Sequence, residues 1–226
     1  TRTSLIIDPP NGRLPPLTEL GEQIRAEQAA ALAARQIEGP TQVYTLYDSW
    51  LDHLPYTRCL ARPMPRISQA YNHGAQILQA PGYVVIYYES MHDTRVIPLD
   101  GRPHIPPSVR QWNGDARGRW DGETLVVDWR NFTDKLDFEG FPQDDMRYVE
   151  RFTRVDANTI EYEVTVHAPT VWTRPWTVSL PWRSDDPNYH RPADLYDFAC
   201  HEGNYRMMRN TLSGSRALRE GRMEPQ

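Results

Sequence analysis

Alternating apolar and polar positions predict that this chain is built mainly from β-strands. The alternation is clearest at residues 159–167, where every second side chain is apolar. A period of two places neighbouring side chains on opposite faces of a strand, so one face is expected to be buried and the other wet. Residues 83–89 form a β-branched and aromatic run after Pro81-Gly82, which is also typical of a strand.

Further segments are predicted to be strands at residues 94–99, 119–120, 123–129, 146–155 and 172–182. Asp121-Gly122 is typical of a two-residue hairpin turn, because glycine adopts positive φ angles readily. The polar residues at 156–158 indicate a second hairpin turn. Pro175 and Pro181 predict that the last strand is bent or lies at an edge of its sheet.

The two ends of the chain are predicted to lie outside the sheet. Four prolines in residues 1–17 indicate an extended arm. Residues 19–38 are mostly good helix formers, with Thr18 as the expected N-cap. A shorter helical or loop stretch is expected at 43–54, and helical character is expected to return after Asn204.

These elements favour a mainly β fold: an antiparallel meander that forms a lipocalin-like barrel or half-barrel, with N-terminal and C-terminal helical segments. We expect residues 1–226 to form a single domain. Its parts are an extended arm and helix at 1–58, the β-barrel at 59–200, and a C-terminal helical tail at 201–226. The arm is expected to pack either on its own barrel or on a neighbouring chain, and the second arrangement would make a homo-oligomer.

Charge and hydropathy argue against two classes of partner. The formal net charge is -5 and no basic stripe is present, so nucleic acid is not an expected partner. No run of about 18 apolar residues is present, so no membrane span is expected. The chain shows no His-x-His pair, no Cys pair with metal spacing and no glycine-rich phosphate loop, so we expect neither a cofactor nor a bound metal.

Aromatic residues with a polar group are abundant in the chain. It contains 7 Trp and 12 Tyr but only 5 Phe. Such rings suit a ligand pocket or a half-wet surface, although they also fill protein cores. The residues selected as candidate ligand contacts are His73, Tyr88, Trp112, Arg117, Trp120, Arg174 and Tyr205.

The two cysteines are Cys59 and Cys200. In an oxidising compartment they would form a disulfide between the N-terminal and C-terminal regions, which stabilises a fold by restricting the unfolded chain. The alternative is a pair of buried free thiols. Spacing in the sequence leaves both open, because a disulfide depends on the distance between the two Cα atoms.

Three polar clusters are candidates for chemistry. The first is residues 92–95, between two strong strands, where a histidine can exchange a proton near neutral pH; the alternative is an ordinary polar hairpin tip. The second is residues 100–104, for which a structural role is favoured. The third is residues 200–205, where His201 and Glu202 form either an acid/base pair or a polar helix entry.

Three segments of the chain resemble a family of exported bacterial proteins. They are residues 95–104, which contain Asp-Gly-Arg-Pro-His, residues 118–128, Gly-Arg-Trp-Asp-Gly-Glu-Thr-Leu-Val-Val-Asp, and residues 200–205, Cys-His-Glu-Gly-Asn-Tyr. The resemblance covers most of the chain from Cys59 onward. It implies a lipocalin-like sheet and a periplasmic or secreted location. Most members, from soil and aquatic bacteria, have no assigned activity, so the resemblance assigns no catalytic residue.

The leading hypothesis for function is a cofactor-independent enzyme of lyase or isomerase type. It would act on a small aromatic molecule by proton transfer, as in elimination, dehydration or carbon–carbon cleavage. Six residues are expected to carry this chemistry: His92 and His201 as alternative bases, Asp93 and Glu202 as the carboxylates that orient them, and Arg95 and Tyr71 as stabilisers of developing negative charge.

Two alternatives use the same fold. The first is a non-catalytic binding protein for an apolar or carbohydrate ligand, which the number of Trp and Tyr residues supports equally well. The second is a metal-dependent enzyme with His92, His104 and His201 as ligands, because metal ligands need not be close in the sequence. The sequence leaves the choice among the three open.

Overall fold

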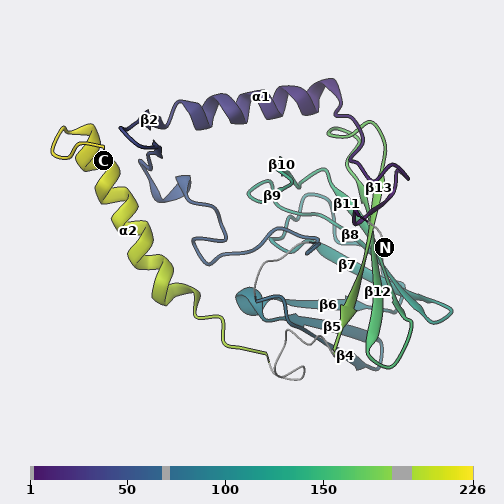
Figure 1. Ribbon diagram of the computed structural model, residues 1–226. Coiled ribbons are helices and arrows are strands. Elements are labelled where there is room, and N and C mark those ends of the chain that lie inside the picture. Colours follow the sequence, from purple (N-terminus) through teal and green to yellow (C-terminus); the bar gives the residue numbers. More distant parts are fainter. Residues whose placement is uncertain (1–2, 68–71, 185–194, 226) are drawn as a thin grey trace.

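Two antiparallel β-sheets and two α-helices are the largest elements of the described chain (Figure 1). The structure is a computed structural model, and it describes residues 3–67, 72–184 and 195–225. The mainly β class predicted from the alternating pattern is confirmed.

The larger sheet has six strands in the order β1 (Ile6–Asp8), β13 (Trp176–Arg183), β12 (Thr159–His167), β11 (Arg147–Arg154), β8 (Thr124–Arg130) and β7 (Asp115–Asp121). The predicted hairpin turn at 156–158 joins β11 to β12. Asp121 pairs with Thr124, so the turn between β7 and β8 is Gly122-Glu123, one residue later than predicted. Gly122 has a φ of 60°, which glycine adopts without strain.

The second sheet contains β4 (Ala75–Ala80), β5 (Tyr83–Tyr88) and β6 (Thr94–Pro98). It meets the larger sheet where β6 lies beside β7, at Gly118. A Cβ atom added to Gly118 would come within 2.6 Å of Ile97 Cγ2, so only glycine allows this approach. The hydrogen-bonded ladders of the two sheets stay separate in the described residues, so the antiparallel class is confirmed and closure into a barrel is not.

Four short strands form two hairpins, β2 (Gln36–Glu38) with β3 (Val43–Thr45) and β9 (Asp137–Phe138) with β10 (Phe141–Pro142). Two 3-10 helices are η1 (Trp50–Asp52) and η2 (Ser90–His92). The helix predicted at 19–38 is therefore too long: α1 (Glu19–Ala33) ends before β2. The residues that follow it pair with β3 instead, and Leu46 N donates a hydrogen bond to Arg35 O at 2.7 Å. The stretch at 43–54 contains β3 and η1.

The two α-helices lie at the periphery of the sheets (Figure 1). Thr18 Oγ1 accepts a hydrogen bond from Gly21 N at 3.0 Å, which confirms the predicted N-cap of α1. The second helix, α2 (Cys200–Arg219), starts before Asn204, earlier than predicted. No helix in the described residues is both long enough and apolar enough to cross a membrane.

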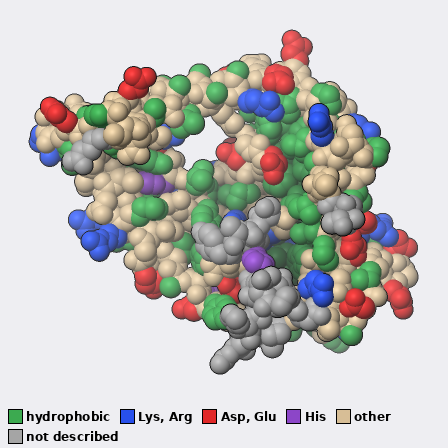
Figure 2. Space-filling model, in the orientation of Figure 1, with side chains coloured by type: hydrophobic (Ala, Val, Ile, Leu, Met, Phe, Trp, Pro, Cys, Tyr) green, Lys and Arg blue, Asp and Glu red, His purple; other side chains and the backbone are tan. Residues whose placement is uncertain are grey.

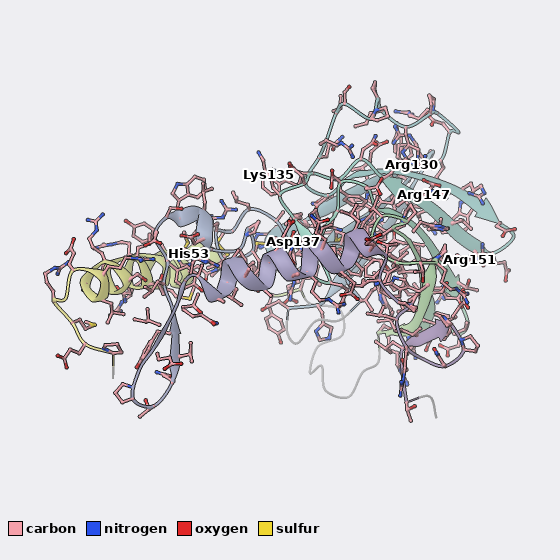
Figure 3. The ribbon with its side chains drawn as sticks, turned by 90° about the horizontal axis from the view of Figure 1, so that it is seen from above. His53, Arg130, Lys135, Asp137, Arg147 and Arg151 are labelled. Carbon is pink, nitrogen blue, oxygen red and sulfur yellow. A yellow bond between two sulfur atoms is a disulfide. The ribbon has the colours of Figure 1, made fainter. Side chains whose placement is uncertain are left out.

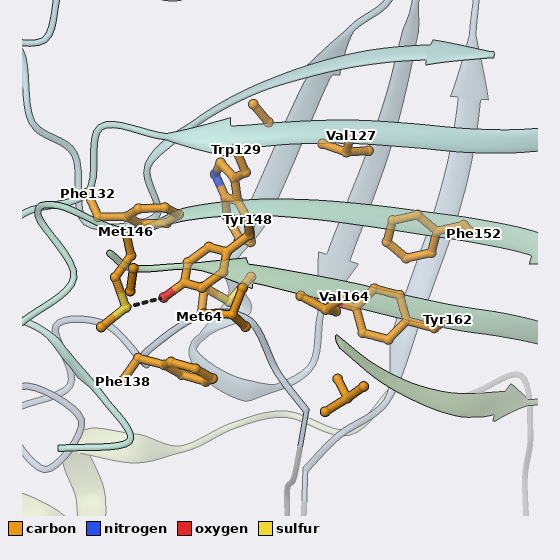
Figure 4. Close-up of a cluster of buried hydrophobic side chains, with 14 of the residues drawn as sticks. Met64, Val127, Trp129, Phe132, Phe138, Met146, Tyr148, Phe152, Tyr162 and Val164 are labelled. Atoms are coloured by element: carbon orange, nitrogen blue, oxygen red, sulfur yellow. Dashed lines mark hydrogen bonds between the residues drawn. The ribbon is translucent and has the colours of Figure 1, made fainter. Parts of the chain in front are cut away.

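Aromatic side chains dominate the core between the sheets (Figure 4). The rings of Trp129, Phe132 and Tyr148 meet edge to face, with centroids 5.1 to 6.2 Å apart. The buried Tyr148 hydroxyl accepts from Gln143 Nε2 at 2.7 Å and donates to Met146 Sδ at 3.1 Å. The rings are therefore closely packed, and the buried Tyr148 hydroxyl has hydrogen-bond partners both as an acceptor and as a donor.

Cys59 and Cys200 form a disulfide, with Cα atoms 5.9 Å apart and a sequence separation of 141 residues. The disulfide alternative of the sequence analysis is thus confirmed over free thiols. The bond ties the first residue of α2 to the segment that follows η1. In the sequence, Cys59 precedes β4 and Cys200 follows β13, so the bond joins the segments before and after these strands.

We expect the double variant Cys59→Ser/Cys200→Ser to lower the free energy of unfolding by about 2–5 kcal/mol, because the cross-link restricts a long loop of the unfolded chain. Urea denaturation measures the change. Adding a reductant should destabilise the wild-type chain by the same amount and leave the double variant unaffected. Equal stability of the oxidised and reduced wild-type chain would contradict this prediction.

Candidate functional site

A cavity of about 760 Å³ lies between the two sheets. Its lining comes from β4 and β5 of the smaller sheet and from β7, β8, β11, β12 and β13 of the larger one. The apolar part of the lining includes Ile77, Ile86, Leu125, Phe152, Leu180 and Trp182. A largely apolar cavity of this size is suited to a small molecule.

Strand alternation explains which side chains reach the cavity. On β4, Ala75, Ile77 and Gln79 line it. Leu78, which lies between two of them and on the opposite face of the strand, is 48% exposed. The cavity therefore occupies the inner face of β4, and the outer face of the strand meets solvent.

One part of the cavity wall is aromatic. The rings of Phe152 and Trp182 meet edge to face with centroids 5.5 Å apart, and Tyr88 contacts Trp182 in the same manner at 6.3 Å. Tyr162, behind this wall, lies 4.8 Å from Trp182. The rings come from β5, β11, β12 and β13, so the wall exists only after both sheets have formed.

Arg66 brings a buried positive charge to the cavity lining. It forms an ion pair with Asp93 and donates a hydrogen bond to the carbonyl oxygen of Ser90 at 3.1 Å. Its guanidinium carbon lies 4.4 Å from the centroid of the Tyr88 ring, a cation–π contact. Burial raises the pKa of Asp93 above its ordinary value, and the positive charge of Arg66 opposes this shift. Arg66 is thus held in place by the protein itself.

Arg95 and Glu150 form an ion pair that joins the two sheets, with side chains 2% and 0% exposed. Arg95 Nη1 donates to Glu150 Oε1 at 3.2 Å and to the Tyr88 hydroxyl at 3.0 Å. The Tyr162 hydroxyl donates to Glu150, and the guanidinium carbon of Arg95 lies 3.5 Å from the centroid of the Trp129 ring. Burial by itself lowers the pKa of Arg95, but the Glu150 carboxylate raises it above its ordinary value. Tyr88 connects this network to the cavity.

The first predicted cluster does not form an acid/base pair at the cavity. His92 Nε2 lies 3.3 Å from Asp197 Oδ1, whereas Asp93 binds Arg66. Neither His92 nor Asp93 is among the described residues that line the cavity. His92 is the last residue of η2 and has a φ of 51°, whereas Asp93 follows it in extended backbone, so the two side chains point in different directions. Arg95, expected to stabilise developing charge, is occupied by the buried ion pair.

The third predicted cluster lies on the surface. His201 and Glu202 are exposed in the first turn of α2, and neither lines the cavity in the described residues. The structure therefore does not bring His201 and His92 together at the cavity, and their catalytic roles stay predictions. Tyr71 lies outside the described residues.

Three of the predicted ligand contacts line the cavity: His73, Tyr88 and Trp120. Four others do not line it in the described part of the chain: Trp112, Arg117, Arg174 and Tyr205. Arg117 donates instead to the Pro103 carbonyl oxygen at 2.9 Å and pairs with Asp115 at 2.6 Å. Arg174 pairs with Asp8 at 2.7 Å. These two arginines hold loops and strands of the protein together.

His104 belongs to an ionic cluster away from the other candidate histidines. Its Nδ1 lies 2.7 Å from Asp115 Oδ2 and its Nε2 lies 3.2 Å from Asp128 Oδ1. Arg130 and Arg147, neighbours in Figure 3, both pair with Asp128. Burial raises the pKa of Asp128, but the hydrogen bonds from Arg147 and Arg130 bring it below its ordinary value. Within the residues that the structure describes, no three or more His, Cys, Asp or Glu side chains are arranged to hold a metal.

Sequence reasoning missed several residues of the cavity and of the network beside it. Trp182 lies on the inward-facing side of β13. Glu150 lies between Tyr148 and Phe152 on the inward-facing side of β11. An acidic residue at an inward position is a signal of a buried partner, and it was present in the sequence. No local pattern indicates Arg66, which reaches the cavity from a segment outside the strands.

Comparison with known proteins assigns neither a family nor a function to the chain. The chain matches no protein-family model, no curated protein and no solved structure. Any functional proposal therefore depends on the cavity and on the network beside it.

We expect Glu150→Leu to lower the free energy of unfolding by about 3–5 kcal/mol, because it leaves the buried charge of Arg95 without its partner. The double variant Arg95→Met/Glu150→Leu removes both charges and should recover most of that loss. Chemical denaturation of the three chains measures both effects. If the double variant were as unstable as the single one, the pairing would not be the source of the stability.

Proposed function

We propose that this chain binds a small, mainly apolar molecule of aromatic character in the cavity between its two sheets. The cavity itself carries the proposal: its volume of about 760 Å³ lies within the range of roughly 300–1,000 Å³ found for small-molecule sites. The rings of Phe152 and Trp182 offer faces and edges on which an aromatic ligand can stack.

The charged residues of the cavity lining favour a ligand with an acidic substituent. In the described residues the lining contains three arginines, Arg66, Arg154 and Arg183, against a single carboxylate, Glu123. Arg66 is also paired with Asp93, and Arg154 also donates to the carbonyl oxygens of Asp156 and Ala157. A guanidinium group binds carboxylate and sulfonate oxygens through two parallel hydrogen bonds. The proposed ligand class is therefore an aromatic molecule with an acidic group. A carbohydrate is less favoured, because aliphatic side chains form much of the wall.

Replacing Ile77 by Trp should fill part of the cavity and weaken binding of anilinonaphthalene sulfonate, an aromatic anion, by about tenfold or more. The matched control is Leu78→Trp, which adds the same ring to the outer face of the same strand. Fluorescence titration gives both dissociation constants. Equal affinities in the two variants would mean that the probe binds outside the cavity.

A second candidate function is cofactor-independent proton transfer of the lyase or isomerase type in the same cavity. Tyr88 is the observation that favours it. Tyr88 lines the cavity beside Trp182, and its hydroxyl is protonated at neutral pH because burial raises its pKa above the ordinary value. This hydroxyl accepts from Arg95 and can donate its own proton to a ligand oxygen that gains negative charge. His73, also in the lining, is the candidate proton acceptor.

Tyr88→Phe removes this proton and keeps the ring. We expect the variant to bind anilinonaphthalene sulfonate with an affinity close to that of the wild-type chain, because the cavity keeps its shape. Turnover of any small aromatic acid that the wild-type chain converts should fall by about 100-fold, a typical contribution of general acid catalysis. A mass-spectrometric screen of aromatic acids identifies such a substrate. Full turnover by Tyr88→Phe would remove Tyr88 from the mechanism.

We also propose that the two sheets form a lipocalin-like half-barrel and that the chain is exported to the periplasm or beyond the cell. The close approach of β6 and β7 at Gly118 supports the half-barrel. The disulfide supports export, because such bonds persist mainly in oxidising compartments. Both proposals agree with the resemblance to exported bacterial proteins, which stays a prediction.

A further inference from the structure

Helix α1 is exposed along almost its whole length. Gly21 is the one buried residue among its 15, and Leu20 and Leu32 are 47% and 44% exposed. Figure 1 shows α1 running from the larger sheet to the β2–β3 hairpin, and Ile24 is the α1 side chain that packs against the core. A helix of this length is only marginally stable alone in water and gains most of its stability from packing. Within the described chain α1 has little of that packing.

The N-terminal half of α2 is exposed in the same way. Tyr205 is 66% exposed and Met207 is 43% exposed, whereas Ser215 and Ala217 in the other half are buried. The buried half is fixed by contacts with the segment after β3, where Tyr47 N donates to Ser215 Oγ at 2.9 Å. Figure 2 shows an opening between α1 and the rest of the molecule, with hydrophobic side chains along the sheet side of it. Both helices therefore present apolar side chains to solvent.

The two helices carry opposite charges. Helix α1 contains three glutamates, at positions 19, 22 and 27, and one arginine, so its formal net charge is -2. The N-terminal half of helix α2, residues 200–209, contains Arg206, Arg209 and Glu202, so its net charge with neutral histidine is +1. The other two arginines of α2 lie in its second half, where Arg219 pairs with Asp48 at 2.7 Å. Arg206 and Arg209 belong to the exposed half of α2. One chain thus displays an acidic helix and a basic helix, each with exposed apolar residues.

We propose that these helices form the interface of a homodimer, in which α1 of one copy packs against the N-terminal half of α2 of the other. A second copy fits both surfaces, because the acidic helix of each chain meets the basic helix of its partner twice in a two-fold arrangement. The contact covers exposed apolar side chains such as Leu20 and Met207. The partner of these helices is therefore a second copy of this chain.

Paired charge reversals test the proposal on the full chain. Glu22→Arg/Glu27→Arg makes α1 basic, and Arg206→Glu/Arg209→Glu makes the exposed half of α2 acidic. We expect the wild-type chain to sediment as a dimer at micromolar concentration and each variant to sediment with the mass of one chain. An equimolar mixture of the two variants should recover the dimer, because every contact in the mixed pair joins opposite charges again.

The matched control is Arg13→Glu/Arg119→Glu, which reverses two exposed arginines outside both helices and should leave the dimer intact. Circular dichroism verifies that each variant is folded. Three results would overturn the proposal: a monomeric wild-type chain, a dimer that survives both helix reversals, or a mixture of the two variants that stays monomeric.

Discussion

One buried ion pair links the two sheets, because Arg95 belongs to β6 of the smaller sheet and Glu150 belongs to β11 of the larger one. Two charges are stable inside a core only when their remaining hydrogen-bonding capacity is also used. Tyr88 and Tyr162 bind the pair from two further strands, and the face of Trp129 covers the guanidinium group. The pair therefore fixes how the two sheets face one another.

The shape of the cavity depends on how the two sheets face one another, because both sheets line it. Tyr88 accepts a hydrogen bond from the ion pair and at the same time forms part of the cavity wall, so the structural network ends at the site of the proposed chemistry. Arg66 adds a second charge that is held by Asp93 and by the backbone of Ser90. A ligand in this cavity would meet charges and a hydroxyl that are already oriented, which is the condition for specific binding.

The helices at the periphery are packed less completely than the sheets. The sheets bury their apolar faces against each other, whereas α1 and half of α2 leave apolar side chains in solvent. The Cys59–Cys200 disulfide fixes the start of α2 without covering it. A homodimer would supply the packing that these helices lack, and the helix residues proposed for its interface are not among the described residues that line the cavity.

Local pattern by itself determined β5, β6, β8, β11 and β12, the turn at 156–158 and the N-cap at Thr18, because each depends on neighbouring residues. It missed β1, β4 and most of β7, and it left the two cysteines open between a disulfide and free thiols. Tertiary structure decided the rest. The end of α1 depends on pairing between β2 and β3, and the choice of a disulfide depends on a distance across 141 residues. The candidate site shows the same division. His92 and Asp93 are adjacent in sequence yet have separate partners, whereas Arg95 and Glu150 meet only because two sheets face each other. Strand pairing, which acts over long sequence separations, brings chemical groups together in ways that a local pattern does not contain.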